Sequence, residues 1–434
     1  MQIATALSRA RSHVSTSKML ITSRVRGMQF LGTLHVRNYQ GRSHDDDKYD
    51  RERVKNSKRI VIKVGTAVVF NNVTGQLAVS RIGGLVEQMK ALKMQGKQIL
   101  LISSGAVGLG RGQLKMTNED TDGSVQGILN KQACAATGQA ALLGMYTSMM
   151  GSMGMTCAQV LITQHDFVCP ERYAKLTDTL ERLVELDIIP IINENDVVTG
   201  GAASGSDAAF TDNDMLSALV AAGVRADAVA MMTDVDAVFD KPPSEPGASR
   251  ISVYDKDQVV EIGALSVGGR GGMASKIVSA QTAAAGGVNA VVANGIDLEN
   301  IYRIFNGDDI GTLFPAADMR PTKLQHWLAH AATSTSMGGS VKVTVSAAKR
   351  LAAGMTRMPL QKDEILDVCG VLDPNSPVEI LDVVGNVIGR GMVSACMNSP
   401  TVDDNTIKGF SNLVKMPGFN IELAADPVAD DALQ

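Results

Sequence analysis

Short apolar runs rich in Val and Ile alternate along the chain with longer segments of helical periodicity. The first run, Arg59 to Val64, is followed by helical spacing from Ser80 to Gln95 and by a second run from Gln98 to Ile102. This is a β-α-β unit, and the alternation continues downstream. Further strands are predicted at residues 158–163, 188–192, 228–236 and 290–293, and helices at residues 126–150, 171–186 and 212–223. The pattern predicts an α/β fold with an open, mainly parallel sheet sandwiched by helices.

One predicted strand, Ile188 to Ile192, stops abruptly in the polar residues Asn193 to Asp196. Ligands of open α/β sheets bind at the carboxyl ends of the strands, so a site is expected there. A second acidic group, Asp212 to Asp214, precedes an apolar helix and has a structural explanation as its cap and first turn. Capping does not explain Glu194 and Asp196.

Two lysines lie at positions that suit contact with phosphate. Lys63 ends the first strand, and Lys276 follows the glycine run Gly268 to Gly272 at the start of a helix. The small residues from Ser103 to Gly110 would let backbone N–H groups approach an anion closely. The chain has no Walker A loop, because Gly-Lys-Ser/Thr is absent from it. Phosphate contact and an ordinary surface loop both remain open for the glycine run.

A second, β-rich domain is predicted after the α/β domain. Residues 341–345 alternate as a strand, residues 346–353 have helical spacing, and residues 378–391 have the pattern of a hairpin. The predicted organisation is an N-terminal extension and linker at 1–58, an α/β domain at 59–316, a linker at 317–337, the small domain at 338–425 and an acidic tail at 426–434.

The first 44 residues contain no Asp or Glu but seven Lys or Arg among many Ser and Thr. Such a leader resembles an organelle transit peptide. A disordered tail or a misplaced start codon, with Met28 as an alternative start, explains it equally well. We therefore expect a cytoplasmic protein, with mitochondrial import as a comparable alternative.

Overall charge and composition exclude several other classes of protein. A net charge of −4 gives no general attraction to nucleic acid, and no apolar run reaches the ~18 residues of a membrane-spanning helix. Five scattered cysteines indicate neither a disulfide framework nor a zinc site. His326 and His330 are one helical turn apart without a carboxylate or cysteine partner, so we expect surface residues beside Trp327 rather than metal ligands.

The chemistry of these candidates favours phosphoryl transfer. Two lysines on separate loops and clustered carboxylates, with no catalytic His or Cys candidate, describe a site that positions and neutralises charge. Phosphoryl transfer requires such a site, because charge spread over the moving group is stabilised by lysines, Mg²⁺ and backbone amides.

Several motifs resemble, in this order, the glutamate 5-kinases of the amino acid kinase family. They are Lys63-Val64-Gly65-Thr66, Ser103-Ser104-Gly105-Ala106, Gln132-Ala133-Cys134-Ala135-Ala136, Ile192-Asn193-Glu194-Asn195-Asp196, Asp212-Asn213-Asp214, Thr233-Asp234, Gly271-Gly272-Met273-Ala274-Ser275-Lys276 and Gly311-Thr312-Leu313-Phe314. The resemblance covers residues 59 to about 316. The part from Gly338 to Phe419 is more loosely similar to the PUA domain that many bacterial members carry.

The resemblance implies transfer of the ATP γ-phosphate to the side-chain carboxylate of L-glutamate, the first step of proline synthesis. It assigns Lys63 and Lys276 to the transferring phosphoryl group and Asp214 to orienting both lysines. It implies glutamate binding by Ser104, Asp196, Asp212 and Asn213, and nucleotide binding by Lys63, Thr233, Asp234, Arg270, Gly271, Gly272, Met273, Ala274, Ser275 and Lys276.

Further expectations follow from the same resemblance. Mg²⁺ is expected on the ATP phosphates with few dedicated protein ligands. Proline is expected as a feedback inhibitor, and a homodimer or homotetramer as the assembly, without a membrane. The chain departs from the family pattern at Thr211, where glycine is usual, at Arg270, and in an insertion within residues 198–210.

The sequence leaves two alternatives open. An aspartate, acetylglutamate or carbamate kinase would use the same phosphate machinery with another acceptor. A non-catalytic, amino-acid-sensing or RNA-binding protein is a different class, since PUA modules elsewhere bind RNA. The part of the chain from Met337 onward contains eight Lys or Arg and twelve Asp or Glu, and this acidic balance argues against binding of the RNA backbone.

Overall fold

The structure is a computed structural model that describes residues 24–25, 28–29, 44–71, 76–199, 212–255, 272–318, 320–331, 337–352, 360, 362–370, 377–393 and 411–414. The chain divides into two compact units, Met1–Arg42 and Ser43–Gln434. In the first unit, β1 (Arg24–Val25) and β2 (Met28–Gln29) pair antiparallel. The second unit contains the two larger sheets and all helices among the described residues.

The larger sheet has seven strands in the order β11-β10-β9-β3-β6-β8-β7, and only β11 runs antiparallel to its neighbour. This confirms the predicted mainly parallel α/β fold. The strands are β3 (Arg59–Val64), β6 (Gln98–Ser103), β7 (Cys157–Ile162), β8 (Ile189–Glu194), β9 (Ala228–Thr233), β10 (Asn289–Asn294) and β11 (Thr312–Phe314). The sequence pattern did not identify β11, which is too short for alternation to show.

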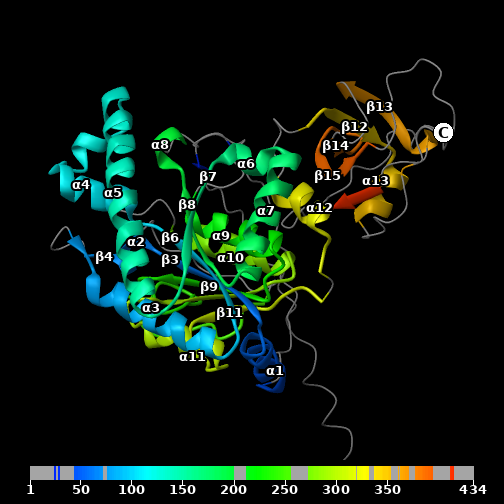
Figure 1. Cartoon of the computed structure of the whole chain (residues 1–434). Helices are drawn as coiled ribbons and strands as arrows, with labels where there is room; N and C mark the ends of the chain where they lie inside the picture. The colour runs from blue at the N-terminus through cyan, green and yellow to red at the C-terminus, as the bar shows by residue number, and fades with distance from the viewer. Residues whose placement is uncertain are drawn as a thin grey trace, which may run out of the picture. The chain divides into compact units, whose positions relative to one another are not determined.

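Helices lie on both sides of this sheet (Figure 1). They are α1 (His44–Lys55), α2 (Thr66–Val69), α3 (Val79–Met94), α4 (Ala106–Leu114), α5 (Val125–Ser152), α6 (Gln164–Val168), α7 (Pro170–Glu185), α8 (Asp196–Thr199), α9 (Asn213–Gly223), α10 (Met273–Ala285), α11 (Glu299–Phe305) and α12 (Lys323–His326). A short hairpin of β4 (Phe70–Asn71) and β5 (Gln76–Leu77) follows α2.

Two hydrophobic cores fill the spaces between the sheet and its helices. Successive strand residues point to opposite faces, so Val61 joins the core under α7, α9 and α10, whereas Ile60 and Ile62 join the core under α3 and α11. Lys63 has the same parity as Val61. The alternation of β3 therefore directs this lysine to the face that α9 and α10 cover.

Helices α4 and α5 pack with their backbones almost in contact. A Cβ added at Gly110 would lie 1.8 Å from the carbonyl oxygen of Cys134, and one added at Gly138 would lie 1.9 Å from the carbonyl oxygen of Ala106. Only glycine fits at these positions. The close contact fixes α5 relative to the start of α4, which immediately follows Ser104 and Gly105.

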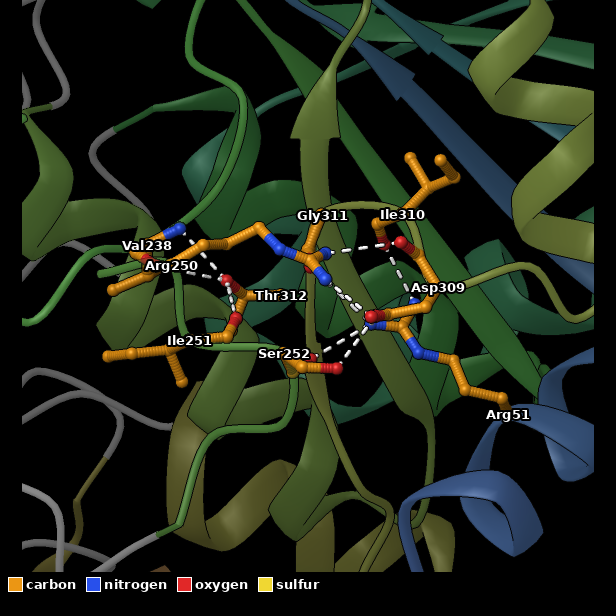
Figure 2. Close-up of polar contacts among 9 residues, drawn as sticks. All are labelled: Arg51, Val238, Arg250, Ile251, Ser252, Asp309, Ile310, Gly311 and Thr312. Atoms are coloured by element: carbon orange, nitrogen blue, oxygen red, sulfur yellow. Dashed lines mark hydrogen bonds and ion pairs between the residues drawn. The ribbon is translucent and has the colours of Figure 1, made fainter. Parts of the chain in front are cut away.

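The prediction of a linker before β3 was wrong. Residues 44–55 form α1, and its Arg51 is buried against the turn before β11 (Figure 2). The Arg51 guanidinium donates to the carbonyl oxygens of Ile310 at 2.8 Å and Ser252 at 2.9 Å, and to Asp309 Oδ1 at 3.1 Å. Dense charge predicted exposure here, but these partners lie about 200 positions or more away, and local composition does not reveal them.

The segment 317–337, predicted as a linker, contains a helical stretch that belongs to the first domain's core. Trp327 is 1% exposed, and its indole N–H donates to the carbonyl oxygen of Phe167 at 2.6 Å. His326 is buried as well, with its ring centroid 4.9 Å from that of the half-buried His330, so the expectation of a surface residue was wrong for His326. The prolines at 315 and 321 mark the turn into this stretch rather than a domain boundary.

The smaller sheet has the order β13-β12-β14-β15-β16 and a core of its own. Asp382 stabilises the turn between β14 and β15, because its Oδ1 accepts from the backbone N–H groups of Val384, Gly385 and Asn386 at 2.8 to 2.9 Å. The elements are β12 (Gly339–Val343), α13 (Val345–Ala352), β13 (Ile365–Gly370), β14 (Pro377–Leu381), β15 (Val387–Met392) and β16 (Ser411–Val414).

Candidate active site

The carboxyl ends of the central parallel strands lie level with one another. Ile102 of β6 pairs with Lys63 of β3 on one side and with Ile192 of β8 on the other. Lys63 in turn pairs with Met231 of β9. The residues that follow on each strand therefore reach the same edge, where the switch from strand to helix leaves room for a ligand.

At this edge one carboxylate joins the two predicted catalytic lysines. Asp214 Oδ1 lies 2.6 Å from Lys63 Nζ, and Asp214 Oδ2 lies 3.3 Å from Lys276 Nζ. All three side chains are buried, with exposures of 6%, 11% and 4% for Lys63, Lys276 and Asp214. The structure thus brings together three residues from β3, α9 and α10.

The electrostatics of this group keep Asp214 ionised. Burial alone would raise the pKa of its carboxyl, but the ammonium groups of Lys63 and Lys276 outweigh burial and hold the pKa below its ordinary value. Removing one partner from a buried ion pair commonly costs about 3–5 kcal/mol, because a charge is left uncompensated. Two lysines and one carboxylate carry a net charge of +1. This excess suits an anionic ligand such as a phosphoryl group.

Beside the lysines, four uncharged side chains form a hydrogen-bonded row. Asn213 Nδ2 donates to Ser104 Oγ at 2.7 Å and to Asn193 Oδ1 at 2.9 Å. Asn193 Nδ2 donates in turn to Gln139 Oε1 at 2.9 Å. The structure therefore places the predicted glutamate-binding residues Ser104 and Asn213 in direct contact.

Two further carboxylates stand near this row. Burial, aided by the charge of Asp196, raises the pKa of Glu194 to about 7, and burial raises the pKa of Asp196 to about 6. Asp212 is predominantly structural in this conformation. Its Oδ1 accepts from the backbone N–H of Met215 at 2.9 Å as the cap of α9, and its Oδ2 accepts from the Ser275 hydroxyl.

The predicted nucleotide-binding residues are described in part. The buried Thr233 ends β9, and its hydroxyl donates to Asp234 Oδ1 at 3.0 Å. Gly272 precedes α10, which carries Met273, Ala274 and Ser275 in its first turn. Arg270 and Gly271 lie outside the described residues, as do Thr211 and residues 200–210 of the stretch 198–210 in which the insertion is expected.

Two residues of this site escaped assignment from sequence. Asn193 stands within the motif Asn193 to Asp196 but was given no role, and Gln139 lies in a helix of small residues. A buried glutamine among alanines and glycines was the available signal, since a buried amide needs a partner.

Two other kinds of feature are absent from the described part of the chain. No three His, Cys, Asp or Glu side chains there are grouped closely enough to hold a metal ion. None of the helices described has the length and apolarity to span a bilayer.

Comparison with known proteins decides the family. The sequence profile of the amino acid kinase family matches residues 58–294, which is more than half of the chain. The chain belongs to the amino acid kinase family. This membership shows that the protein is a kinase with the fold of that family.

Two named relatives show which members of the family this chain is similar to. A glutamate 5-kinase of Trichormus variabilis (strain ATCC 29413 / PCC 7937) is 36% identical over 349 residues, which cover 78% of this chain and 89% of the relative. A delta-1-pyrroline-5-carboxylate synthase of Solanum lycopersicum is 39% identical over 274 residues, 61% of this chain and 38% of the relative. The chain thus spans well under half the length of this second relative.

Among solved structures, the carbamate kinase from Giardia lamblia bound to AMP-PNP is 17% identical, with a TM-score of 0.44. It covers 61% of this chain and 100% of the solved chain.

Proposed function

We propose that this amino acid kinase transfers the γ-phosphoryl group of ATP to the side-chain carboxylate of L-glutamate. The observation that carries the proposal is the contact of Asp214 with both Lys63 and Lys276, next to the row formed by Asn213 and Ser104. The relatives named glutamate 5-kinase, alike over most of their length, support glutamate as the acceptor.

Each half of the site supplies what one reactant needs. A carboxylate that attacks a phosphate meets charge repulsion, and lysines between the two anions relieve it. Lys63 and Lys276 would hold the transferring group while Asp214 keeps both ammonium groups in place. The α-ammonium of the amino acid needs acceptors and negative charge, which Asn213, Glu194 and Asp196 offer.

ATP would lie over Thr233, Asp234 and the start of α10, where backbone N–H groups and the helix dipole favour phosphates. Mg²⁺ would arrive on the ATP phosphates and supply further charge neutralisation there. Proline as an inhibitor, assembly as a dimer or tetramer, the compartment, and a PUA-like role for the smaller sheet stay predictions from the family resemblance.

The test is ATP turnover with a panel of acidic amino acids, combined with trapping of the acyl phosphate by hydroxylamine. We expect hydroxamate formation with L-glutamate and little with L-aspartate, N-acetyl-L-glutamate or carbamate. Hydroxamate formed from another acceptor, or ATP turnover that no acceptor stimulates, would contradict the proposal.

A further inference from the structure

Gln139 lies at the far end of the hydrogen-bonded row from the predicted substrate. It sits on α5, is 8% exposed, and among the described residues of the site its side chain hydrogen-bonds to Asn193. None of the roles proposed above uses it. Buried glutamine in the middle of a helix gains no helix stability over alanine, so its amide calls for another explanation.

The row has a defined polarity that begins at Gln139. Asn193 donates its Nδ2 to Gln139 Oε1, which leaves Asn193 Oδ1 to accept from Asn213. Asn213 then gives its other N–H to Ser104 Oγ. An amide carries both of its donors on nitrogen and its acceptor on oxygen. Reversing the Gln139 amide would therefore place its Nε2 opposite Asn193 Nδ2, so that two donors face each other.

This polarity leaves one acceptor and one donor for a ligand. Asn213 Oδ1 is buried and has no hydrogen-bond partner in the part of the chain that the structure describes. Ser104 Oγ already accepts from Asn213, so its own hydrogen remains to be donated. An amino acid carries an ammonium that donates and a carboxylate that accepts, which matches this pair.

We propose that Gln139 is a positioning residue that orients the amides of Asn193 and Asn213 for amino acid binding. The inference rests on the proposed function, because it assumes that the ligand of Ser104 and Asn213 is the amino acid. Gln139 itself touches no reacting atom.

The packing of α5 keeps Gln139 where this role requires it. The neighbouring Gly138 is so close to the carbonyl oxygen of Ala106 that a Cβ would lie 1.9 Å away. Ala106 begins α4 two residues after Ser104. The two ends of the row, Gln139 and Ser104, are thus held by the same helix contact and do not shift independently.

Two substitutions separate orientation from simple packing. Gln139→Met keeps the length of the side chain but removes the acceptor, whereas Gln139→Glu keeps an acceptor that the Asn193 amide can still donate to. Gln126→Met is the matched control, because Gln126 lies exposed on the same helix and bonds only to Asn130 among the residues described. Gln139→Asn, shorter by one methylene, replaces Gln139→Met if that variant does not fold.

The readouts are the KM for glutamate, the KM for ATP, kcat and the thermal midpoint. We expect Gln139→Met to raise the glutamate KM about 10- to 100-fold, the effect of misorienting one or two hydrogen bonds to charged groups. The ATP KM and kcat should change less than about threefold, and Gln139→Glu should keep the glutamate KM within about threefold of the parent.

Three results would overturn the inference. They are an unchanged glutamate KM in folded Gln139→Met, equal rises in the KM values for glutamate and ATP, and equal losses in the Met and Glu variants at similar thermal midpoints. A parent protein without glutamate-stimulated turnover would instead refute the proposed function, so the two failures are distinguishable.

Discussion

Two groups of buried carboxylates lie at the same edge of the sheet and differ in their cations. Asp214 contacts two lysines, and its pKa stays below the ordinary value despite burial. Glu194 and Asp196 have no ion pair within the described ranges, and burial raises their pKa values to about 7 and about 6. The lysine centre is therefore charged before any ligand arrives, whereas near pH 6.5 the acidic pair acquires its full charge only when a cation binds beside it.

The contrast assigns different kinetic consequences to the two groups. Lysines that are already held by Asp214 are ready for negative charge that develops during transfer, which affects kcat. Glu194 and Asp196 would pair with the ammonium group of the amino acid and so contribute to its binding, which affects its KM. The lysine variants are therefore expected to act on kcat, and the variants near the acidic pair on the glutamate KM.

The largest effect is expected from the lysines. Lys276→Ala and Lys63→Ala should each lower kcat roughly 100- to 1,000-fold, because each removes charge stabilisation that is made in the transition state. The glutamate KM should change little. Steady-state kinetics check this, with the exposed Lys58→Ala, beside the same strand, as a control that keeps parent activity. Near-normal turnover in either catalytic variant would remove the lysine from the mechanism.

A smaller effect is expected from the residues assigned to binding of the amino acid. Asp196→Asn and Asn213→Ala should raise the glutamate KM by roughly 10-fold or more, since each removes a charged or polar contact to the substrate. The ATP KM should move far less. If the ATP KM rises instead, the two subsites have been exchanged in our assignment.

The smallest effect on activity is expected at Arg51, whose contacts serve stability alone. Arg51→Ala should lower the free energy of unfolding by about 1–3 kcal/mol, because the carbonyl groups of Ile310 and Ser252 lose their donor. Thermal or urea unfolding measures this, and kcat of the folded protein should be unchanged. Arg53→Ala, on the same helix but partly exposed, should change stability by less than about 0.5 kcal/mol. Equal stability of the two variants would show that the Arg51 contacts contribute nothing.

The sequence predicted the sheet well because its strands are β-branched runs of the expected length. The strand ending in Asn193 and Glu194 was located correctly, and so was the sheet edge that gathers the polar residues. Strand order and register were not predictable from periodicity. They depend on pairings between residues more than a hundred positions apart, such as Lys63 with Met231.

The elements that sequence reasoning misplaced share a physical cause. Arg51 and Trp327 are anchored by backbone carbonyl groups distant in sequence, and a carbonyl leaves no compositional trace. A charged helix was therefore taken for a linker, and the two histidines beside the buried indole were taken for surface residues. The link from Gln139 to Asn193 was likewise invisible, because it joins two motifs that each look complete by themselves.

The most direct test of the division between the two carboxylate groups is the number of protons exchanged when glutamate binds. Isothermal calorimetry in buffers of different ionisation enthalpy measures it. Near pH 6.5, Glu194 and Asp196 are largely or partly protonated in the free protein, since their pKa values are about 7 and about 6. An ammonium favours their charged forms and lowers both pKa values, so binding should release protons.

We expect net proton release near pH 6.5 that falls toward zero at pH 8.5, and a smaller release in Asp196→Asn. The glutamate KM should correspondingly fall as the pH rises from 5.5 to 8, while the ATP KM stays level. Proton uptake, or tight glutamate binding at pH 6.5 without any proton exchange, would contradict the account.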